Sequence, residues 1–218
     1  MSRTVKIDFV SDVVCPWCAL GATALEQAIA NLAGEIDVEL TYKPFELNPD
    51  MPAVGEHAVE HMMRKYGRSA QQVAERNAMI IQRGKDIGFS FDLEKRSHFF
   101  NTFNAHRLLF WAHVEGRQRA LKQALLRAYF TDGKNPDDAQ TLVNLAGEVG
   151  LDTGRAQAVL ASGEFSQEVR ELQQFYQARG INSVPAMVLN DRELMSGSHS
   201  VAEYQQALRQ AARETAHA

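Results

Sequence analysis

The fold of this chain is decided at residues 5–18, where the sequence reads Val-Lys-Ile-Asp-Phe-Val-Ser-Asp-Val-Val-Cys-Pro-Trp-Cys. Apolar and polar residues alternate at the start of this stretch, and the alternation predicts a strand over residues 5–10. From residue 17 to residue 32 the apolar positions follow helical spacing, and Gly34 can end the helix in the left-handed conformation. A second alternating run at 36–42 predicts another strand. Strand, helix and strand within about 40 residues predict a βαβ unit, whose two strands are parallel.

A second piece of the same sheet is predicted near the C-terminus. Two short apolar runs, at residues 186–189 and 193–196, are joined by a turn-forming Asn-Asp-Arg link and predict an antiparallel hairpin. A last helix is predicted to begin at Ser200, because Ser200 and Glu203 have the spacing of a capping box. We therefore expect the sheet to be assembled from both ends of the chain.

The residues between these two pieces show helical periodicity. Ser69 and Gln72 have the spacing of a capping box, and the two prolines of residues 48–52 favour an exit from the sheet. A helix expected at 168–179 either closes the insertion or reopens the sheet domain. The predicted α/β organisation has three parts: a first sheet segment at residues 1–50, a helical insertion domain at 51–164 and a second sheet segment at 165–218.

Composition excludes several classes of protein. The 218 residues are 45% hydrophobic and 23% charged, which is enough to bury one good core. No apolar stretch approaches the roughly 20 residues of a membrane span, so we expect no membrane partner. The net charge of -4 provides no basic field for phosphates, so we expect no nucleic acid partner. The N-terminal residues lack the apolar core of a secretory signal, and we expect a cytoplasmic location.

The two cysteines stand three residues apart, as Cys15-Pro16-Trp17-Cys18, at the predicted start of a helix. Pro16 fits the first helical position, which makes Cys15 the N-cap. Free helix amides and the helix dipole favour the thiolate, and CxxC pairs can lower a thiol pKa from about 8.5 to about 3.5–7.5. We therefore predict that Cys15 is the nucleophile and Cys18 the resolving thiol, with Pro16 and Trp17 tuning the loop. This chemistry requires no metal and no organic cofactor.

Val184 and Pro185 come directly before the predicted hairpin. A proline at the head of a strand gives up a hydrogen bond of the sheet, which calls for an explanation. A cis Val184-Pro185 bond packed against the cysteines would provide one. It would leave the backbone N–H and C=O of Val184 free to pair with an extended thiol substrate, in the manner of strand addition.

The chain resembles the DsbA family of thioredoxin-fold proteins, near its FrnE-type branch. The resemblance implies an α/β thioredoxin-like fold (βαβ…αββα) interrupted by an all-helical insertion domain, dithiol-disulfide exchange at the CxxC pair and a cis proline facing it. The segments that carry the resemblance are residues 8–12, 15–18, 44–49, 105–109, 183–186 and 197–200.

Two departures from the relatives matter for the chemistry. The family includes 2-hydroxychromene-2-carboxylate isomerases and kappa-class glutathione transferases, which resemble this chain but typically have serine at the position matching Cys15. Periplasmic DsbA proteins carry histidine where this chain has Trp17. Tryptophan adds no positive charge to hold the thiolate. We therefore predict a potential below the value of about -120 mV for DsbA, nearer to the value of about -270 mV for thioredoxin.

Four histidines are further candidates for function. His106 belongs to the insertion segment that the resemblance places over the active-site groove, and His199 lies in the loop before the last helix, so both are candidate substrate contacts. The run from His57 to His61 matches the H-x-x-E-H pattern of inverted zinc proteases. No third ligand is identifiable, and a structural zinc site would need four ligands, so we expect no metal.

The leading hypothesis is a thiol-disulfide oxidoreductase or isomerase acting on a thiol or disulfide substrate, either protein or small molecule. Glutathione is a candidate co-substrate. The alternative is a glutathione-dependent isomerase or transferase acting on small aromatic compounds. A third hypothesis is a binding protein whose insertion grips a partner while the cysteines stay idle. The sequence leaves both a monomer and a homodimer open.

Overall fold

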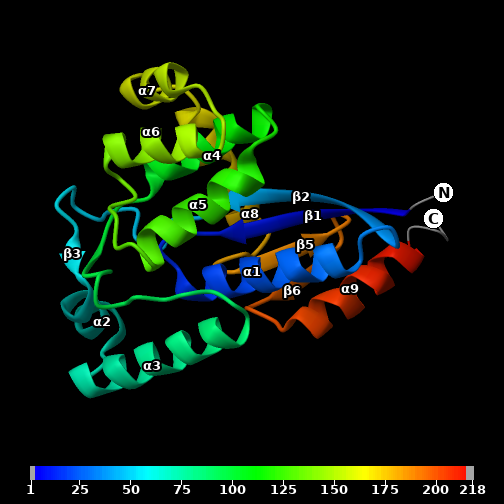
Figure 1. The fold of residues 1–218 in the computed structure, drawn as a ribbon, viewed down its shortest axis with the longest axis horizontal. Coiled ribbons are helices and arrows are strands. Elements are labelled where there is room, and N and C mark those ends of the chain that lie inside the picture. Colours follow the sequence, from blue (N-terminus) through cyan, green and yellow to red (C-terminus); the bar gives the residue numbers. More distant parts are fainter. Residues whose placement is uncertain (1–2, 215–218) are drawn as a thin grey trace.

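The computed structural model describes residues 3–214 and contains a four-stranded mixed sheet (Figure 1). The strand order is β2-β1-β5-β6, so β1 at the centre pairs in parallel with β2 and antiparallel with β5. The two halves of the sheet therefore come from opposite ends of the sequence, as predicted. The strands are β1 (Arg3–Ser11), β2 (Ile36–Pro44), β5 (Ala186–Leu189) and β6 (Glu193–Ser196).

Helices cover both faces of this sheet. Because side chains alternate along β1, Phe9 and Val10 point to opposite faces. Phe9 lies on the face covered by α1 (Pro16–Asn31) and α9 (Val201–Glu214), whereas Val10 packs with residues of α8 (Ser166–Ala178). This three-layer arrangement of helices and sheet is the expected thioredoxin-like fold.

One glycine lets α1 approach the sheet closely. A Cβ at Gly21 would lie 3.2 Å from the Phe9 ring and 3.1 Å from the hydroxyl of Tyr204 on α9. The absence of a side chain there holds the first turns of α1, with the two cysteines, against the end of β1.

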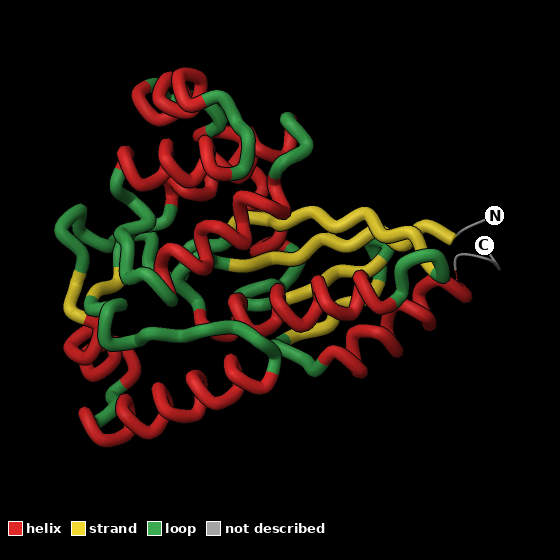
Figure 2. Tube along the Cα trace, viewed as in Figure 1, coloured by secondary structure: helices red, strands yellow, loops and turns green. Residues whose placement is uncertain are grey.

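The insertion is mainly helical and lies beside one end of the sheet (Figure 2). It also contains a two-residue antiparallel pair, β3 (Glu56–His57) with β4 (His98–Phe99), which corrects the expectation of an all-helical insertion. Such short strands leave no periodicity in the sequence. The helices of the insertion are α2 (Ala58–Tyr66), α3 (Ala70–Asp86), α4 (Phe103–Val114), α5 (Gln118–Phe130), α6 (Ala139–Glu148) and α7 (Thr153–Ala161).

The insertion and the sheet share one hydrophobic core. Leu25 of α1, Leu108 of α4 and Leu121 of α5 belong to the same buried cluster, and each is fully buried. The insertion is therefore rigidly attached to the strand-helix unit that carries the cysteines. Within residues 3–214, no helix combines the length and the apolar character needed to cross a membrane.

Both predicted capping boxes are confirmed. The Ser69 hydroxyl accepts from the backbone N–H of Gln72 while the Gln72 side chain accepts from the backbone N–H of Ser69. At the start of α9, the Glu203 carboxylate accepts from the backbone N–H of Ser200 at 2.7 Å, and the Ser200 hydroxyl accepts from the backbone N–H of Glu203 at 3.3 Å.

Candidate active site

The cysteine pair occupies the first turn of α1. Cys15 is the N-cap, in extended conformation, and Pro16 takes the first helical position, which confirms the local geometry expected from the sequence. Both cysteines are free thiols. Cys15 is 3% exposed and Cys18 is fully buried, while Trp17 between them is partly exposed. A substrate can therefore reach Cys15 before it can reach Cys18.

The two thiols have opposite electrostatic environments. The pKa of Cys15 is lowered, first by the hydrogen bond from the Cys18 thiol and then by the backbone amides of Cys18 and Trp17, against the effects of burial and of Asp12. The pKa of Cys18 is raised well above its ordinary value, because the thiol is buried and its hydrogen bond favours the Cys15 anion. Cys15 is thus the thiol that ionises first and can attack.

The loop before β5 lies next to Cys15. The Val184-Pro185 peptide bond is cis, which confirms that prediction. The Cys15 thiol lies 3.9 Å from the carbonyl oxygen of Val184, and Val184 is partly exposed. The Pro185 carbonyl accepts a hydrogen bond from the Gly197 N–H at 2.8 Å, which ties this loop to the residues after β6. The loop before β5 therefore borders the Cys15 thiol.

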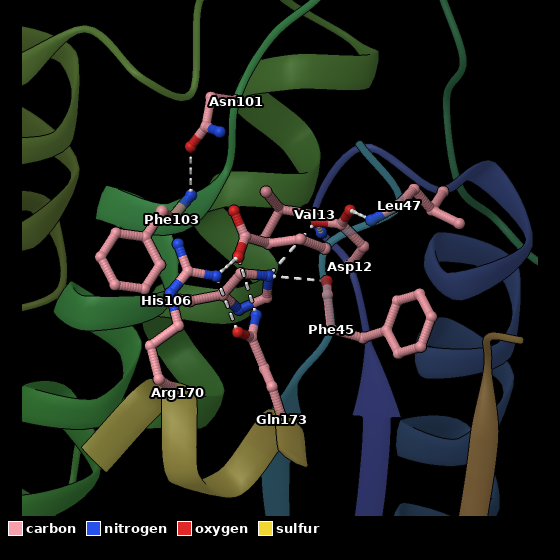
Figure 3. Close-up of polar contacts among 10 residues, drawn as sticks. Asp12, Val13, Phe45, Leu47, Asn101, Phe103, His106, Arg170 and Gln173 are labelled. Atoms are coloured by element: carbon pink, nitrogen blue, oxygen red, sulfur yellow. Dashed lines mark hydrogen bonds and ion pairs between the residues drawn. The ribbon is translucent and has the colours of Figure 1, made fainter. Parts of the chain in front are cut away.

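A buried carboxylate, Asp12, lies beneath the cysteine loop (Figure 3). Its two oxygens accept from the backbone N–H groups of Val13 and Leu47, each at 2.7 Å, and one also lies 3.3 Å from Nε2 of His106. Burial raises the pKa of Asp12, but the bonds from His106 and from the Leu47 amide together bring it below its ordinary value. Asp12 is therefore an anion that joins the cysteine loop to the loop after β2.

His106 does not lie at the surface of the site. Its side chain is 2% exposed, and Nε2 lies 3.0 Å from the carbonyl oxygen of Phe45 as well as near Asp12. Since a carbonyl can only accept, Nε2 carries the hydrogen. The geometry gives His106 a positioning contact with Asp12, and the substrate contact suggested by the sequence stays a prediction.

A second buried carboxylate, that of Glu46, extends the same network toward α8, whose Arg170 and Gln173 are labelled in Figure 3. One oxygen of Glu46 accepts from Arg170 and from Gln173 Nε2, the latter at 3.0 Å, and the Glu46 side chain is 2% exposed. Arg170 also stacks 3.9 Å from the centroid of the Phe103 ring on α4. These contacts connect the loop after β2 to the insertion and to α8.

Lys122, a residue of α5 near Cys18, was not predicted as part of the site from the sequence. Lys122 is fully buried, and within residues 3–214 its ammonium has no hydrogen-bond partner; it lies 5.5 Å from the centroid of the Tyr42 ring. Burial lowers its pKa, while the nearby Cys18 and Asp12 favour its charged form. The sequence did carry a signal of its burial, because Lys122 lies on the same helical face as Leu125 and other apolar residues.

His199 lies to one side of the cysteines. It is partly exposed, and its Nε2 lies 2.9 Å from the carbonyl oxygen of Ser196. His199 lines a pocket of about 310 Å³ together with Leu20 of α1 and Arg83 of α3, and Arg83 stacks 5.2 Å from the centroid of the Trp17 ring. This pocket lies along α1 at Leu20 and Ala24, after the CxxC residues.

The histidines of the H-x-x-E-H pattern do not converge on a common point. His57 is exposed and ends β3, whereas His61 is buried and lies 2.7 Å from a carboxylate oxygen of Glu56. The His61 ring is therefore occupied by a partner within the insertion. Among residues 3–214, no three His, Cys, Asp or Glu side chains are grouped so that they could hold a metal ion.

Comparisons with known proteins agree with this arrangement. The profile of the DSBA-like thioredoxin domain matches residues 6–209. A crystal structure of a probable DsbA oxidoreductase from Streptomyces coelicolor is 31% identical, with a TM-score of 0.88, and covers 96% of this chain and 91% of that chain. The uncharacterized protein YwbO of Bacillus subtilis is 28% identical over 193 residues, which cover 86% of this chain and 88% of YwbO. The cytosolic disulfide reductase DsbM from Pseudomonas aeruginosa, solved with GSH, shares the fold at 18% identity, with a TM-score of 0.61 over 96% of each chain.

Proposed function

Because this chain belongs to the family of DSBA-like thioredoxin domains, we propose that it is a thiol-disulfide oxidoreductase that exchanges disulfides through Cys15 and Cys18. The observation that carries the proposal is the opposite perturbation of the two thiols. Cys15 has a lowered pKa at the helix start, and Cys18 has a raised pKa directly below it. A dithiol built in this way attacks with one sulfur and resolves with the other.

The proposed reaction has two exchange steps. The Cys15 thiolate attacks one sulfur of a substrate disulfide, which forms a mixed disulfide and releases the other substrate sulfur as a thiolate that takes up a proton. Cys18 then loses its proton and attacks the Cys15 sulfur. This step forms the Cys15–Cys18 disulfide and releases the second substrate thiol. The substrate gains two electrons and two protons, and the enzyme dithiol loses them; the reverse sequence oxidises a dithiol.

The residues around the cysteines have supporting roles in this proposal. Val184 presents its backbone to an extended substrate, and Pro185 shapes the loop that faces Cys15. Pro16 fixes the first turn of α1, and Trp17 covers it together with Arg83. His199 can meet a substrate that extends along the pocket beside α1. No metal or organic cofactor enters either step.

A specific observation keeps a glutathione-dependent activity as the second candidate. DsbM, a cytosolic disulfide reductase with the same fold, was solved with GSH. Glutathione is therefore a candidate co-substrate, and a glutathione-dependent isomerase or transferase acting on small aromatic compounds is the alternative function. Such an activity would not need Cys18. The same relative supports a proposed cytoplasmic location.

The test is reduction of insulin by dithiothreitol, measured as turbidity. We expect the wild-type protein to accelerate it and Cys15→Ser to lower the rate to the uncatalysed level. Cys18→Ala should still attack but should accumulate a mixed disulfide that mass spectrometry detects. Full activity of Cys18→Ala with glutathione and an aromatic substrate, without insulin reduction by the wild type, would instead support the isomerase or transferase.

The proposed potential is a second measurable property. Equilibration with glutathione buffers should give a value below about -120 mV, because Trp17 contributes no positive charge to the thiolate. A value at or above that of DsbA would contradict this assignment of the loop chemistry.

A further inference from the structure

Two histidines lie opposite each other on the short ribbon that β3 and β4 form in the insertion. His57 of β3 pairs with His98 of β4, and their ring centroids are 5.6 Å apart. His57 is exposed and His98 is partly exposed, so solvent reaches both rings. The H-x-x-E-H pattern joins His57 to His61 in the sequence, whereas the fold brings it to a histidine on another strand.

The pair occupies the kind of cross-strand position in which side chains approach most closely. At the neighbouring position, the backbone N–H of Ala58 donates to the carbonyl oxygen of Ser97 at 2.8 Å. Hydrogen-bonded and non-hydrogen-bonded pairs alternate along an antiparallel ladder, so His57 and His98 form a non-hydrogen-bonded pair. The Cα atoms of such a pair are about 4.5 Å apart, against about 5.5 Å for a hydrogen-bonded pair. The ribbon therefore presents two imidazoles on one face at short range.

The backbone that carries His98 is fixed to the core. Its carbonyl oxygen accepts from the Tyr129 hydroxyl at 2.9 Å, and both Tyr129 and the next residue, Phe99, belong to the buried cluster. The Ser97 hydroxyl lies 2.8 Å from Nδ1 of the His98 ring. When Nδ1 donates its hydrogen to this oxygen, Nε2 keeps a free lone pair, and hydrogen bonds of this kind orient the imidazoles that bind metals.

The nitrogen atoms of this pair are not occupied by carboxylates. His61, His106 and His199 each lie next to a carboxylate oxygen, at 2.7, 3.3 and 3.9 Å respectively. The ion pairs formed within residues 3–214 include neither His57 nor His98. Lone pairs on both rings are thus open to a ligand from solvent.

The separation of the two rings is close to the spacing that a shared metal ion requires. A Zn–N bond is about 2.0–2.1 Å, and the nitrogen lies about 1.1 Å from the ring centre, so two imidazoles bound at a tetrahedral angle have centroids about 5.2 Å apart. The observed 5.6 Å is only slightly longer. The terminal torsion of a histidine side chain is broad, so turning the exposed His57 ring toward His98 costs little.

We propose that His57 and His98 form a binding site for a divalent first-row transition-metal ion such as Zn²⁺ or Cu²⁺, with water in the remaining positions. Imidazole suits these ions, whereas Mg²⁺ and Ca²⁺ prefer oxygen ligands. Because no three His, Cys, Asp or Glu side chains are grouped among residues 3–214, the two imidazoles are the whole protein ligand set there. The site departs from the absence of metal expected from the sequence, and it is independent of the proposed disulfide exchange.

Isothermal titration calorimetry with ZnCl₂ tests the site. The full-length protein carries Cys15→Ser and Cys18→Ser as a common background, because thiolates also bind zinc. We expect one Zn²⁺ to bind per chain and Mg²⁺ not to bind. Loss of an outer-shell partner alone typically costs about 10–100-fold in metal affinity, so loss of a ligand in His57→Gln or His98→Gln should weaken binding by at least about tenfold.

The matched control is His113→Gln, which alters an exposed histidine at the end of α4 and should keep the dissociation constant of the background protein. Electron paramagnetic resonance of the Cu²⁺ complex provides a second readout, because it counts bound nitrogen atoms. It should detect two imidazoles in the background protein and one in each of His57→Gln and His98→Gln. Thermal unfolding without metal should be the same for all the histidine variants, since these side chains lie at the surface.

Several results would overturn the site. They are the lack of Zn²⁺ binding at millimolar concentration, binding that depends on only one of the two histidines or on neither, and an equal weakening by His113→Gln. A Cu²⁺ spectrum with a single imidazole in the background protein would also overturn it. None of these outcomes bears on disulfide exchange, which is measured separately with the wild-type cysteines.

Discussion

On the side of α4 and α8, the carboxylates of Asp12 and Glu46 are bonded to side chains or backbone amides. On the side of α2 and α3, by contrast, the ion pairs among residues 3–214 include none of Arg68, Arg76, Arg83 and Arg96. Asp12 meets His106 and two amides, and Glu46 meets Arg170 and Gln173. The comparison indicates that paired charges hold the cysteine loop in shape, whereas the arginines on the other side contribute no such bonds.

The largest effect is expected from Asp12→Ala. The change leaves the Val13 and Leu47 amides without their acceptor and leaves His106 Nε2 with the Phe45 carbonyl alone. Breaking a buried charged network of this kind costs about 3–5 kcal/mol. Urea unfolding of the reduced protein measures the loss. Asp37→Ala, which alters an exposed carboxylate on β2, is the control and should change stability by less than about 0.5 kcal/mol. Equal losses for the two variants would contradict the structural role of Asp12.

Asp12→Asn separates the charge from the hydrogen bonds. Because the Asp12 anion raises the pKa of Cys15, the variant should have a lower Cys15 pKa and react with iodoacetamide at more acidic pH than the wild type. A rate profile that does not move with the variant would show that Asp12 has no electrostatic effect on the thiol.

The next effect is expected from Arg170→Met. The side chain of Glu46 is 2% exposed and would keep only its bond from Gln173, which should cost about 1–3 kcal/mol of unfolding free energy. Arg170 itself is 47% exposed, so the lower end of this range is expected. In a double-mutant cycle with Glu46→Gln, the combined loss should be smaller than the sum of the single losses. Additive losses would mean that the two side chains do not stabilise each other.

Lys122→Met should act in the opposite direction and stabilise the protein by about 1–2 kcal/mol at neutral pH. Burial lowers the pKa of Lys122 below that of the unfolded chain, so folding is penalised at neutral pH, and the penalty fades as pH rises through the folded pKa. The stability gap between variant and wild type should therefore narrow in alkaline solution. Lys85→Met, at an exposed position of α3, should give no such gap.

Lys122→Met also tests whether Lys122 affects the pKa of Cys18. Lys122 lowers the pKa of Cys18, so its loss should raise that pKa further and slow resolution of the mixed disulfide. Alkylation of Cys18 across a pH series, in a Cys15→Ser background, measures the shift. If the pH dependence of Cys18 alkylation did not change, Lys122 would have no effect on the pKa of Cys18.

The smallest effect is expected from Arg68→Gln. Because Arg68 is exposed and forms no ion pair within the described part of the chain, its loss should change the unfolding free energy by less than about 0.5 kcal/mol. Thermal unfolding of Arg68→Gln and of Arg170→Met, measured under the same conditions, compares the two losses of stability. A loss as large as that of Arg170→Met would show that the two sides of the site are structurally alike.

The sheet and its flanking helices could be predicted from sequence because their signals are local. The hairpin strands were predicted at 186–189 and 193–196, and the structure has them at the same residues. The first strand was predicted over 5–10 and extends over Arg3–Ser11. Alternation, helical spacing and capping boxes each act within a few residues, so they can be read without knowledge of the tertiary contacts.

The surround of the site could not be predicted in the same way because it depends on distant pairings. Glu46 and Arg170 meet across 124 positions of sequence, and neither residue carries a local sign of that contact. His106 was singled out correctly as a residue near the site, but its burial under the loop follows only from the packing of α4. Likewise, only the folded structure shows that Nε and Nη1 of Arg96 have no hydrogen-bond partner among the described residues.

The pairing of β1 with β5 has a consequence for how the protein is made. Ile7 lies opposite Leu189, so the central strand gains its second neighbour only after about 180 further residues have been synthesised. At roughly 5–20 residues per second, a ribosome needs about 10–30 seconds to translate from Cys18 to the end of β5. During that interval the nascent thiols belong to a sheet whose central strand still lacks β5.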